Sequence, residues 1–247
     1  MEQNLSKKTR TESDLIGSRE VPESALYGVQ TLRGIENFRI SKFHLNEYPL
    51  FIQALAITKM GAAVANRELD LLTEEQADAI LKACKEILEG KHHDQFPVDM
   101  IQGGAGTTTN MNANEVIANR ALELMGHQRG EYQYCSPNDH VNRSQSTNDA
   151  YPTAIHIGLY YTHLKLVKHF EVLIESFRKK ATEFAHVIKM GRTQLEDAVP
   201  MTLGQTFNGF ASILRHEVKN LDFAAQDFLT VNMGATAIGT GITAEPE

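Results

Sequence analysis

Two long runs of apolar residues at helical spacing, near the end of the 247-residue chain, constrain its fold most strongly. The first run, at 153–191, contains no proline. A helix of roughly 35 residues would be about 50 Å long. That exceeds the diameter of roughly 45 Å expected for a compact globule of this size. A second run follows at 203–228. The rest of the chain is too short to cover the wide apolar stripes of both helices.

These runs predict a mainly α fold. We expect a small mixed or helical N-terminal domain at 1–145, followed at 146–247 by the first part of a long central helical bundle. Further chain, other subunits or both would complete this bundle. The pattern lacks the alternating strands and crossover helices of a doubly wound parallel sheet. The last eight residues read as a loop, so we expect the chain to be a piece of a longer protein.

Shorter elements are predicted in the first half of the chain. Residues 1–20 are polar and read as a mobile arm, and 21–48 read as extended or turn segments. Pro49 opens a helix with apolar residues at 3–4 spacing. Thr73 and Gln76 form the pattern of a capping box, which predicts a second helix that ends at Gly90. A third helix is expected at about 112–125, before Gly126.

Charge and cysteine content exclude several classes of protein. Lys and Arg number 24 against 31 Asp and Glu, a net charge of −7, which argues against a nucleic-acid partner. No stretch approaches the ~20 apolar residues that cross a bilayer, and the N-terminus does not resemble a signal peptide. Cys84 and Cys135 are too few for a disulfide framework or a four-cysteine zinc site. We therefore expect a soluble, cytoplasmic protein with no membrane partner.

Three polar islands interrupt the helical pattern, at 103–112, 142–149 and 191–197. Each gathers small hydroxyls and carboxamides, and the first two precede predicted helices. Free N–H groups and the helix dipole at such ends favour anions, so a small dianionic substrate is the natural type of ligand. The alternative is that these residues only cap helices and form turns, which is the better interpretation of any one island taken alone. Three islands in one chain favour a site.

Other catalytic and cofactor motifs are absent or weak. The glycines at 103–106 lack the Gly-Lys-Ser/Thr ending of a P-loop and follow no convincing strand, and no Gly-x-Ser-x-Gly elbow occurs. Adjacent His92 and His93 read as a solvated turn rather than a metal site. His140 is the one histidine close to an island, although a structural role is the better interpretation. We predict no metal ligands.

The islands carry a resemblance to a known family. The segments are GGAGTTTNMNAN at 103–114, PNDHVNRSQSTNDAYPT at 137–153, KMGRTQLEDAVPMTLGQ at 189–205 and GATAIGTG at 234–241. Together they resemble the aspartase/fumarase superfamily, from about residue 15 to the end of the chain. Ser-Thr-Asn-Asp at 146–149 is similar to the aspartase branch, whereas fumarases more often read Ser-Ser-Asn-Asp.

The resemblance implies an aspartase/fumarase-like fold and reversible deamination of L-aspartate to fumarate and ammonia, without an organic cofactor. The reaction removes a proton next to the β-carboxylate, which then holds the charge as an enediolate-like dianion. By resemblance, Thr107, Ser146 and Thr147 stabilise that charge, as in an oxyanion hole. Asn148, Thr193 and Gln194 would contact the amino group or the α-carboxylate. Many superfamily members carry a histidine where Gln194 stands.

The resemblance also implies parts that residues 1–247 do not contain. The superfamily's general base is a serine on a loop reading Gly-Ser-Ser-x-Met-Pro-x-Lys-x-Asn, and no such sequence occurs here. Its active sites are assembled from three subunits of a tetramer. We therefore expect a homotetramer when full length, no catalytic base in this chain, and no turnover by this chain alone. Two alternatives stay open: a fumarate hydratase of the same superfamily, and a non-catalytic helical assembly module.

Overall fold

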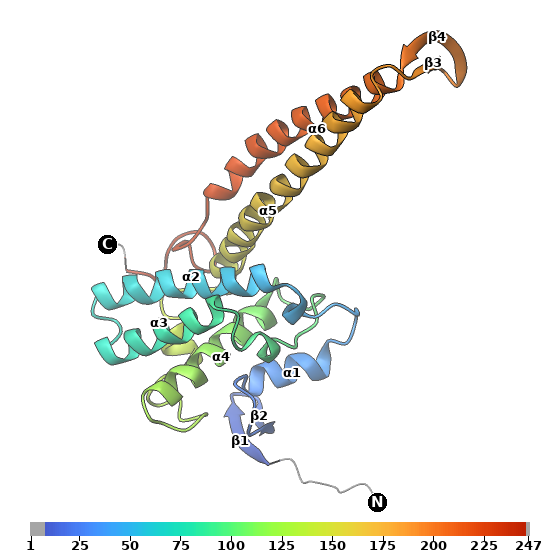
Figure 1. The fold of residues 1–247 in the computed structure, drawn as a ribbon. Coiled ribbons are helices and arrows are strands. Elements are labelled where there is room, and N and C mark those ends of the chain that lie inside the picture. Colours follow the sequence, from blue (N-terminus) through green and yellow to red (C-terminus); the bar gives the residue numbers. More distant parts are fainter. Residues whose placement is uncertain (1–7, 246–247) are drawn as a thin grey trace, which may run out of the picture. The chain divides into compact units, whose positions relative to one another are not determined.

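The computed structural model describes residues 8–245, which form two compact units (Figure 1). The first contains the described residues up to Gly158 together with those from Val231 onward, and the second is Leu159–Thr230. Helix α5 (Thr147–Glu183) begins in the first unit and continues into the second. The domain boundary that the sequence suggests, between residues 145 and 146, stays a prediction.

The first unit is built around three helices. Its elements are β1 (Thr9–Asp14), β2 (Gly17–Pro22), α1 (Val29–Asn37), α2 (Pro49–Glu68), α3 (Glu74–Leu88), α4 (Thr107–Leu124), short 3-10 turns at Leu45–Glu47 and His93–Gln95, a π-helical turn η3 (Pro137–Val141), and the start of α5. Helix α3 packs against both α2 and α4. Ile52, Ile80 and Ile117, one from each of these helices, are fully buried. The expected mainly helical fold is confirmed.

Local signals predicted the ends of several helices. Helix α2 begins at Pro49, and the capping box of Thr73 and Gln76 forms both of its hydrogen bonds at the start of α3. Helix α4, in contrast, begins at Thr107 and not near residue 112, so that prediction is wrong. Its first turns bury Asn110, Asn112 and Asn114. A helix that is buried on most sides and rich in amides shows no clear apolar periodicity.

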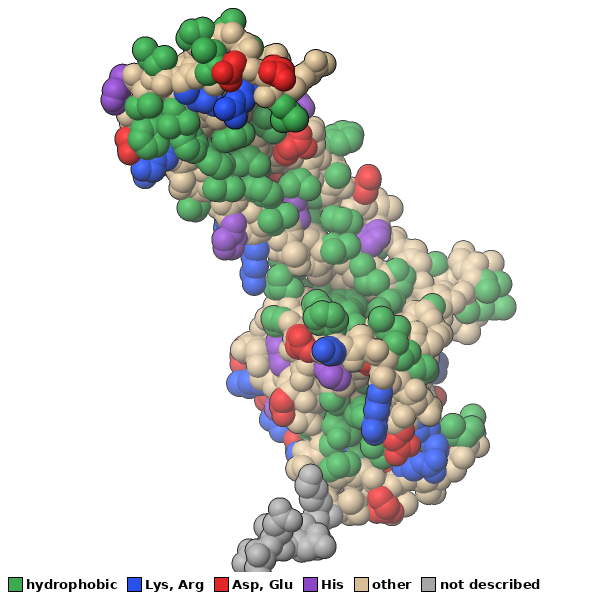
Figure 2. All heavy atoms as spheres, turned by 90° about the vertical axis from the view of Figure 1, so that its right-hand side faces the viewer, with side chains coloured by type: hydrophobic (Ala, Val, Ile, Leu, Met, Phe, Trp, Pro, Cys, Tyr) green, Lys and Arg blue, Asp and Glu red, His purple; other side chains and the backbone are tan. Residues whose placement is uncertain are grey.

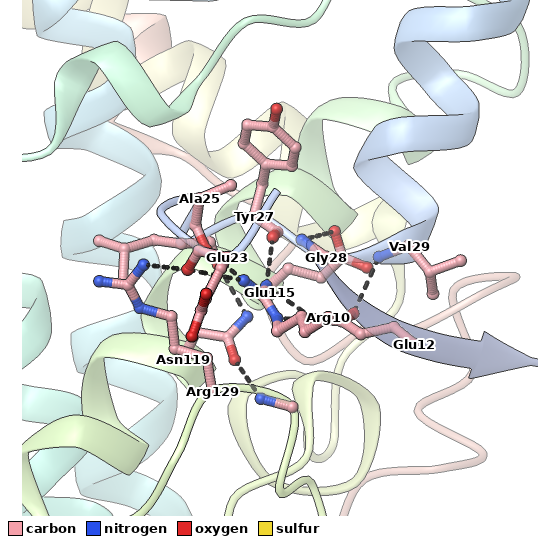
Figure 3. A network of polar contacts seen from close by, with 12 residues as sticks. Arg10, Glu12, Glu23, Ala25, Tyr27, Gly28, Val29, Glu115, Asn119 and Arg129 are labelled. Atoms are coloured by element: carbon pink, nitrogen blue, oxygen red, sulfur yellow. Dashed lines mark hydrogen bonds and ion pairs between the residues drawn. The ribbon is translucent and has the colours of Figure 1, made fainter. Parts of the chain in front are cut away.

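The N-terminal segment is ordered where the structure describes it. We predicted a mobile arm over 1–20, and for residues from Thr9 onward this is wrong, because β1 and β2 form an antiparallel hairpin. Residues 1–7 lie outside the described part. Arg10 donates to the carbonyl oxygens of Ala25 (2.7 Å) and Tyr27 (2.8 Å). The polar side chains that suggested mobility therefore hold the hairpin in place (Figure 3).

Helix α1 was not predicted, because its stabilising partner lies far away in the sequence. Gly28, its N-cap, offers no side chain. The carboxylate of Glu115 on α4 caps the helix instead and accepts the backbone N–H group of Gly28 at 2.8 Å (Figure 3). It also accepts the N–H groups of Gln30 (2.8 Å) and Thr31 (3.0 Å). A negative charge at a helix N-terminus is favourable. Burial raises the pKa of Glu115, and these hydrogen bonds oppose that shift.

The second unit is a helical hairpin with a small sheet. It contains the remainder of α5, β3 (Ile188–Thr193), β4 (Glu196–Thr202), α6 (Leu203–Ala225) and a 3-10 turn at Gln226–Leu229. The 37-residue α5 ends at Glu183, so the predicted continuation of the helix to residue 191 is wrong. β3 and β4 pair antiparallel. Helix α6 begins after a capping box of Thr202 and Gln205.

Aromatic side chains join α5 and α6 near the sheet. The ring of Phe207 lies 6.0 Å from that of Phe177 and 5.8 Å from that of Phe184. Elsewhere these helices expose large apolar side chains (Figure 2), including Val172 at 69% and Phe223 at 82% of full exposure. The unit itself therefore leaves apolar stripes uncovered, as the sequence predicted. No helix of the described chain is apolar over enough length to cross a bilayer.

Replacing Glu115 by Ala should destabilise the first unit. The substitution leaves three backbone donors and the Thr31 hydroxyl without their buried acceptor, so we expect a loss on the order of 3 kcal/mol in the free energy of unfolding. Urea denaturation measures this loss. The matched control is Glu75→Ala at an exposed position of α3, which should change stability by about 0.5 kcal/mol or less. Equal effects of the two substitutions would contradict the capping role of Glu115.

Candidate functional site

The first two polar islands meet in the first unit, where the first turns of α4 and α5 are in contact. Asn110 donates from Nδ2 to the hydroxyl oxygen of Thr147 at 3.1 Å. Gly106, the N-cap of α4, lies against the ring of Tyr151, and a Cβ at this glycine would fall 2.5 Å from the ring carbons. Gly106 also has φ +91°, which favours glycine. The absence of a side chain there allows the two helix ends to approach.

Thr107 is the first residue of α4 and is exposed. Its hydroxyl donates to the carbonyl oxygen of Gly104 at 2.5 Å, which closes the glycine-rich turn before the helix. The first island is thus a helix start, as its composition indicated. The N–H groups of Thr107 and Thr109 already donate to the carbonyl oxygen of Gly104 (3.0 Å) and to Oε1 of Gln102 (2.8 Å), so it is the helix dipole that favours an anion at this end.

Ser146 and Asp149 form a reciprocal cap at the start of α5. The hydroxyl of Ser146 accepts the N–H of Asn148 at 3.2 Å, and the carboxylate of Asp149 accepts the N–H of Ser146 at 2.9 Å. Asp149 is fully buried and also accepts the N–H of Thr236 at 2.8 Å. Asn148 donates to the carbonyl oxygen of Ala237 at 2.8 Å. The segment at 234–241 therefore lies against the second island.

The same segment supports an unusual proline. Pro152 stands inside α5 and cannot donate the helical hydrogen bond to the carbonyl oxygen of Asn148, four residues earlier. Asn232 supplies the missing donor from its side-chain amide at 3.0 Å. This replacement explains how α5 begins at Thr147, six residues before the sequence predicted, despite the proline.

Sequence reasoning missed Lys59, which lies beneath the second island. Its side chain, on α2, is fully buried and donates to the side-chain oxygens of Asn110 (2.8 Å), Asn142 (2.9 Å) and Gln145 (2.9 Å). Burial lowers the pKa of Lys59 to about 7, and the charge of Asp149 opposes that shift. The signal was present in the sequence, because Lys59 lies four residues after Leu55 and four before Ala63, on the apolar stripe of its helix.

Backbone strain is concentrated in the islands. Seven non-glycine residues of the described chain have positive φ, and five of them lie in the four segments that carry the family resemblance. These five are Ala105, Ser144, Gln194, Leu195 and Thr236. Positive φ is costly for side chains of these types and persists where the surroundings enforce it, often at functional sites.

The third island forms the turn of the β3–β4 hairpin in the second unit. Thr193 ends β3, Gln194 begins the turn, and both side chains are exposed. Gln194 and Leu195 have φ of 48° and 70°, as in the tight turns that match the twist of hairpin strands. The structure therefore brings Thr107, Ser146, Thr147 and Asn148 together in one unit and describes Thr193 and Gln194 in the other.

His140 has a structural environment. Its Nδ1 accepts the backbone N–H of Ser136 at 2.7 Å, and Nε2 lies 3.3 Å from the side-chain amide of Gln76. Burial lowers the pKa of this half-buried histidine. Within residues 8–245, no three His, Cys, Asp or Glu side chains converge on a common metal position.

The arrangement in the first unit suits a small anion. Two helix N-termini meet, their side chains are neutral hydroxyls and amides, and a buried lysine lies beneath them. Such groups can orient a carboxylate and donate hydrogen bonds to it.

Comparison with known proteins assigns this chain to a family. The chain matches the family described as Lyase over residues 17–247. The chain belongs to the Lyase family. The match includes all four segments on which the resemblance to the aspartase/fumarase superfamily was based.

The relatives agree with this membership. The chain is 56% identical over 244 residues to aspartate ammonia-lyase from Escherichia coli strain K12, covering 98% of this chain and 51% of the relative. It is 58% identical over 238 residues to the enzyme of the same name from Pseudomonas canavaninivorans, covering 96% and 50%. A crystal structure described as fumarate lyase:delta crystallin from Brucella melitensis has a TM-score of 0.92 at 51% identity, covering 97% and 52%. The chain thus spans about half the length of these relatives.

Replacing Gly106 by Ala should disrupt the contact between α4 and α5. The new Cβ would overlap the ring of Tyr151 and would need positive φ, so we expect a loss of about 2 kcal/mol or more in the free energy of unfolding. Gly61→Ala on α2 is the control, because a Cβ there meets nothing within 4 Å and should be neutral or stabilising. Equal stability of the Gly106→Ala and wild-type proteins in urea would contradict the close approach.

Proposed function

We propose that the protein is a carbon–nitrogen lyase that converts L-aspartate reversibly to fumarate and ammonia. The observation that carries this proposal is the 56–58% identity to aspartate ammonia-lyases over 96–98% of this chain. The neutral donors gathered where α4 and α5 begin are a suitable environment for a dicarboxylate. No organic cofactor enters the proposed reaction.

The chemical problem in this reaction is a weakly acidic C–H bond. A base removes the proton from the carbon next to the β-carboxylate, the electron pair moves onto that carboxylate, and ammonia then leaves from the neighbouring carbon. The intermediate is a dianion at the β-carboxylate. Donors that strengthen their hydrogen bonds as this charge develops lower the barrier. In our proposal Thr107, Ser146 and Thr147 are these donors, and the Thr107 hydroxyl would turn from the carbonyl oxygen of Gly104 to the substrate.

The remaining proposed contacts hold the substrate at its other end. Asn148, Thr193 and Gln194 would bind the amino group or the α-carboxylate. Gln194 offers both a donor and an acceptor without a charge, so it can meet either group. We assign the general base to none of the residues in this chain.

We further propose that the full-length protein is a homotetramer in which several subunits contribute to each site. Two observations support this. Apolar side chains such as Val172, Ile213 and Phe223 are exposed on the helices of the second unit. The proposed ligands are divided between the two units of the chain. The cysteines at positions 84 and 135 are free and buried, which fits a reducing, cytoplasmic location.

The full-length protein should produce fumarate from L-aspartate. Fumarate absorbance measures the reaction directly, and L-malate is the matched substrate because it differs from aspartate by a hydroxyl in place of the amino group. We expect formation from aspartate only. Fumarate from malate alone would instead support a hydratase, and no fumarate from either substrate would favour a non-catalytic assembly module.

Replacing Thr147 by Val should lower kcat by on the order of 10², with a smaller effect on KM, because one donor to the developing charge is lost while the shape is kept. Thr147→Ser keeps the hydroxyl and should retain most of the rate. Steady-state kinetics of both variants on aspartate measure the difference. A Thr147→Val protein with wild-type kcat would remove Thr147 from the proposed role.

A further inference from the structure

The ammonium group of Lys59 has an unusual set of partners. Lysine is seldom fully buried, and when it is, a carboxylate normally compensates its charge. Lys59 is fully buried, yet its three hydrogen bonds all go to neutral amide oxygens, those of Asn110, Asn142 and Gln145, at 2.8–2.9 Å. Among residues 8–245 no carboxylate oxygen lies within 4.0 Å of its Nζ. Such an arrangement is costly for stability, which points to another purpose.

The ammonium fixes the orientation of the amides around it. It has three N–H donors and no acceptor, so each amide must turn its oxygen toward it. With its oxygen held by Lys59, Asn110 must direct Nδ2 the other way. That nitrogen donates to the hydroxyl oxygen of Thr147 (3.1 Å) and to Oδ1 of Asn142 (3.2 Å). Lys59 therefore fixes the orientation of the Asn110 side-chain amide.

This orientation decides what the Thr147 hydroxyl can do. Because the hydroxyl oxygen already accepts an N–H from Asn110, its single proton must point elsewhere. No acceptor in the described part of the chain takes that proton. If Asn110 were flipped, its own oxygen would accept the proton, and the hydroxyl would present only lone pairs to a ligand. Only the observed orientation leaves Thr147 free to donate to a carboxylate.

We propose that Lys59 is a positioning residue that acts through Asn110 to make the Thr147 hydroxyl a hydrogen-bond donor to the substrate carboxylate. The proposal rests on the proposed function, in which Thr147 stabilises the charge that develops on that carboxylate. Lys59 itself does not touch the substrate, because protein oxygens take all three of its N–H groups.

The first test is Lys59→Met in the full-length protein, assayed on L-aspartate. Methionine fills similar space but leaves the amide oxygens of Asn110, Asn142 and Gln145 without their buried donor, so the unfolding temperature should fall, and kcat is measured on protein shown to be folded. kcat should fall on the order of 10- to 100-fold, with KM changing by a much smaller factor. A purely structural lysine would lower the unfolding temperature and leave kcat normal in the folded fraction, which would overturn the proposal. Lys82→Met, at an exposed position of α3, is the matched control and should leave both values unchanged.

A second variant covers the case in which Lys59→Met does not fold. Asn110→Asp keeps oxygen acceptors for Lys59 and has nearly the same size, but it removes the Nδ2 donor to Thr147. We expect the folded variant to lose kcat on the same scale as Lys59→Met. Normal kcat in a folded Asn110→Asp protein would overturn the proposal.

A double-mutant cycle separates an effect through Thr147 from an independent one. If Lys59 acts through this hydroxyl, then adding Lys59→Met to Thr147→Val should lower kcat little further. Multiplication of the two single effects would overturn the route through Thr147. A wild-type protein that forms no fumarate from aspartate would remove the proposed function and this role with it. An active wild type with an unchanged Lys59→Met kcat would remove the positioning role alone.

Discussion

The hydrogen bond from Asn110 to Thr147 joins the first turns of α4 and α5, and the polar surface of the first unit depends on this junction. Each helix presents the positive end of its dipole there. The buried ammonium of Lys59 adds positive charge beneath them. The nearest compensating charge, on Asp149, is already occupied by the N–H groups of Ser146 and Thr236. The junction therefore favours an anion from outside.

Several residues at this junction lower the stability of the first unit, and the remainder of the unit compensates for that loss. Thr236 with positive φ and the fully buried Lys59 each lower stability relative to ordinary residues. The compensation is found in the apolar core of α2, α3 and α4 and in shared polar groups. Asn142 illustrates such sharing, since its Oδ1 accepts from Lys59, Asn110 and Asn114. A network of this kind is stable only when nearly all its members are satisfied, which makes it rigid.

Local chemistry determined which parts of this fold could be predicted. The capping box at Thr73 and the proline at residue 49 act within one turn, so the sequence revealed these helix starts. Helix α1 depends on a cap from Glu115, which lies more than 80 residues away in the sequence. No local sequence pattern predicts a cap from so distant a residue. The polar residues of β1 suggested mobility because their partners, such as the carbonyl oxygen of Tyr27, are visible only in the fold.

The same division applies to the candidate site. The islands containing Thr107 and Ser146 were recognisable by composition and by family resemblance, and the structure brings them together. The groups that orient them were not recognised, because an asparagine or a lysine in a helix reads as ordinary surface. Lys59 could have been suspected from its place on an apolar stripe, but its three acceptors come from α4 and from the 142–149 island. Sequence patterns reveal the donors that face a ligand more readily than the side chains, such as those of Lys59 and Asn110, that orient these donors.

The charge of Lys59 does not contact the substrate directly but acts through Asn110 on the Thr147 hydroxyl, and this arrangement has a chemical advantage for the proposed reaction. A cation in direct contact with the carboxylate would bind the substrate tightly as well as the transition state, and the part of its binding energy common to both would lower KM without raising kcat. A neutral hydroxyl binds the ground state more weakly and still gains strength as negative charge builds on the oxygen it faces. Lys59 cannot make direct contact, because all its N–H groups are engaged, but its field reaches the same oxygen through the oriented amide of Asn110. The burial of this lysine is therefore what allows the proposed site to attract a dianion and still distinguish the intermediate from the substrate.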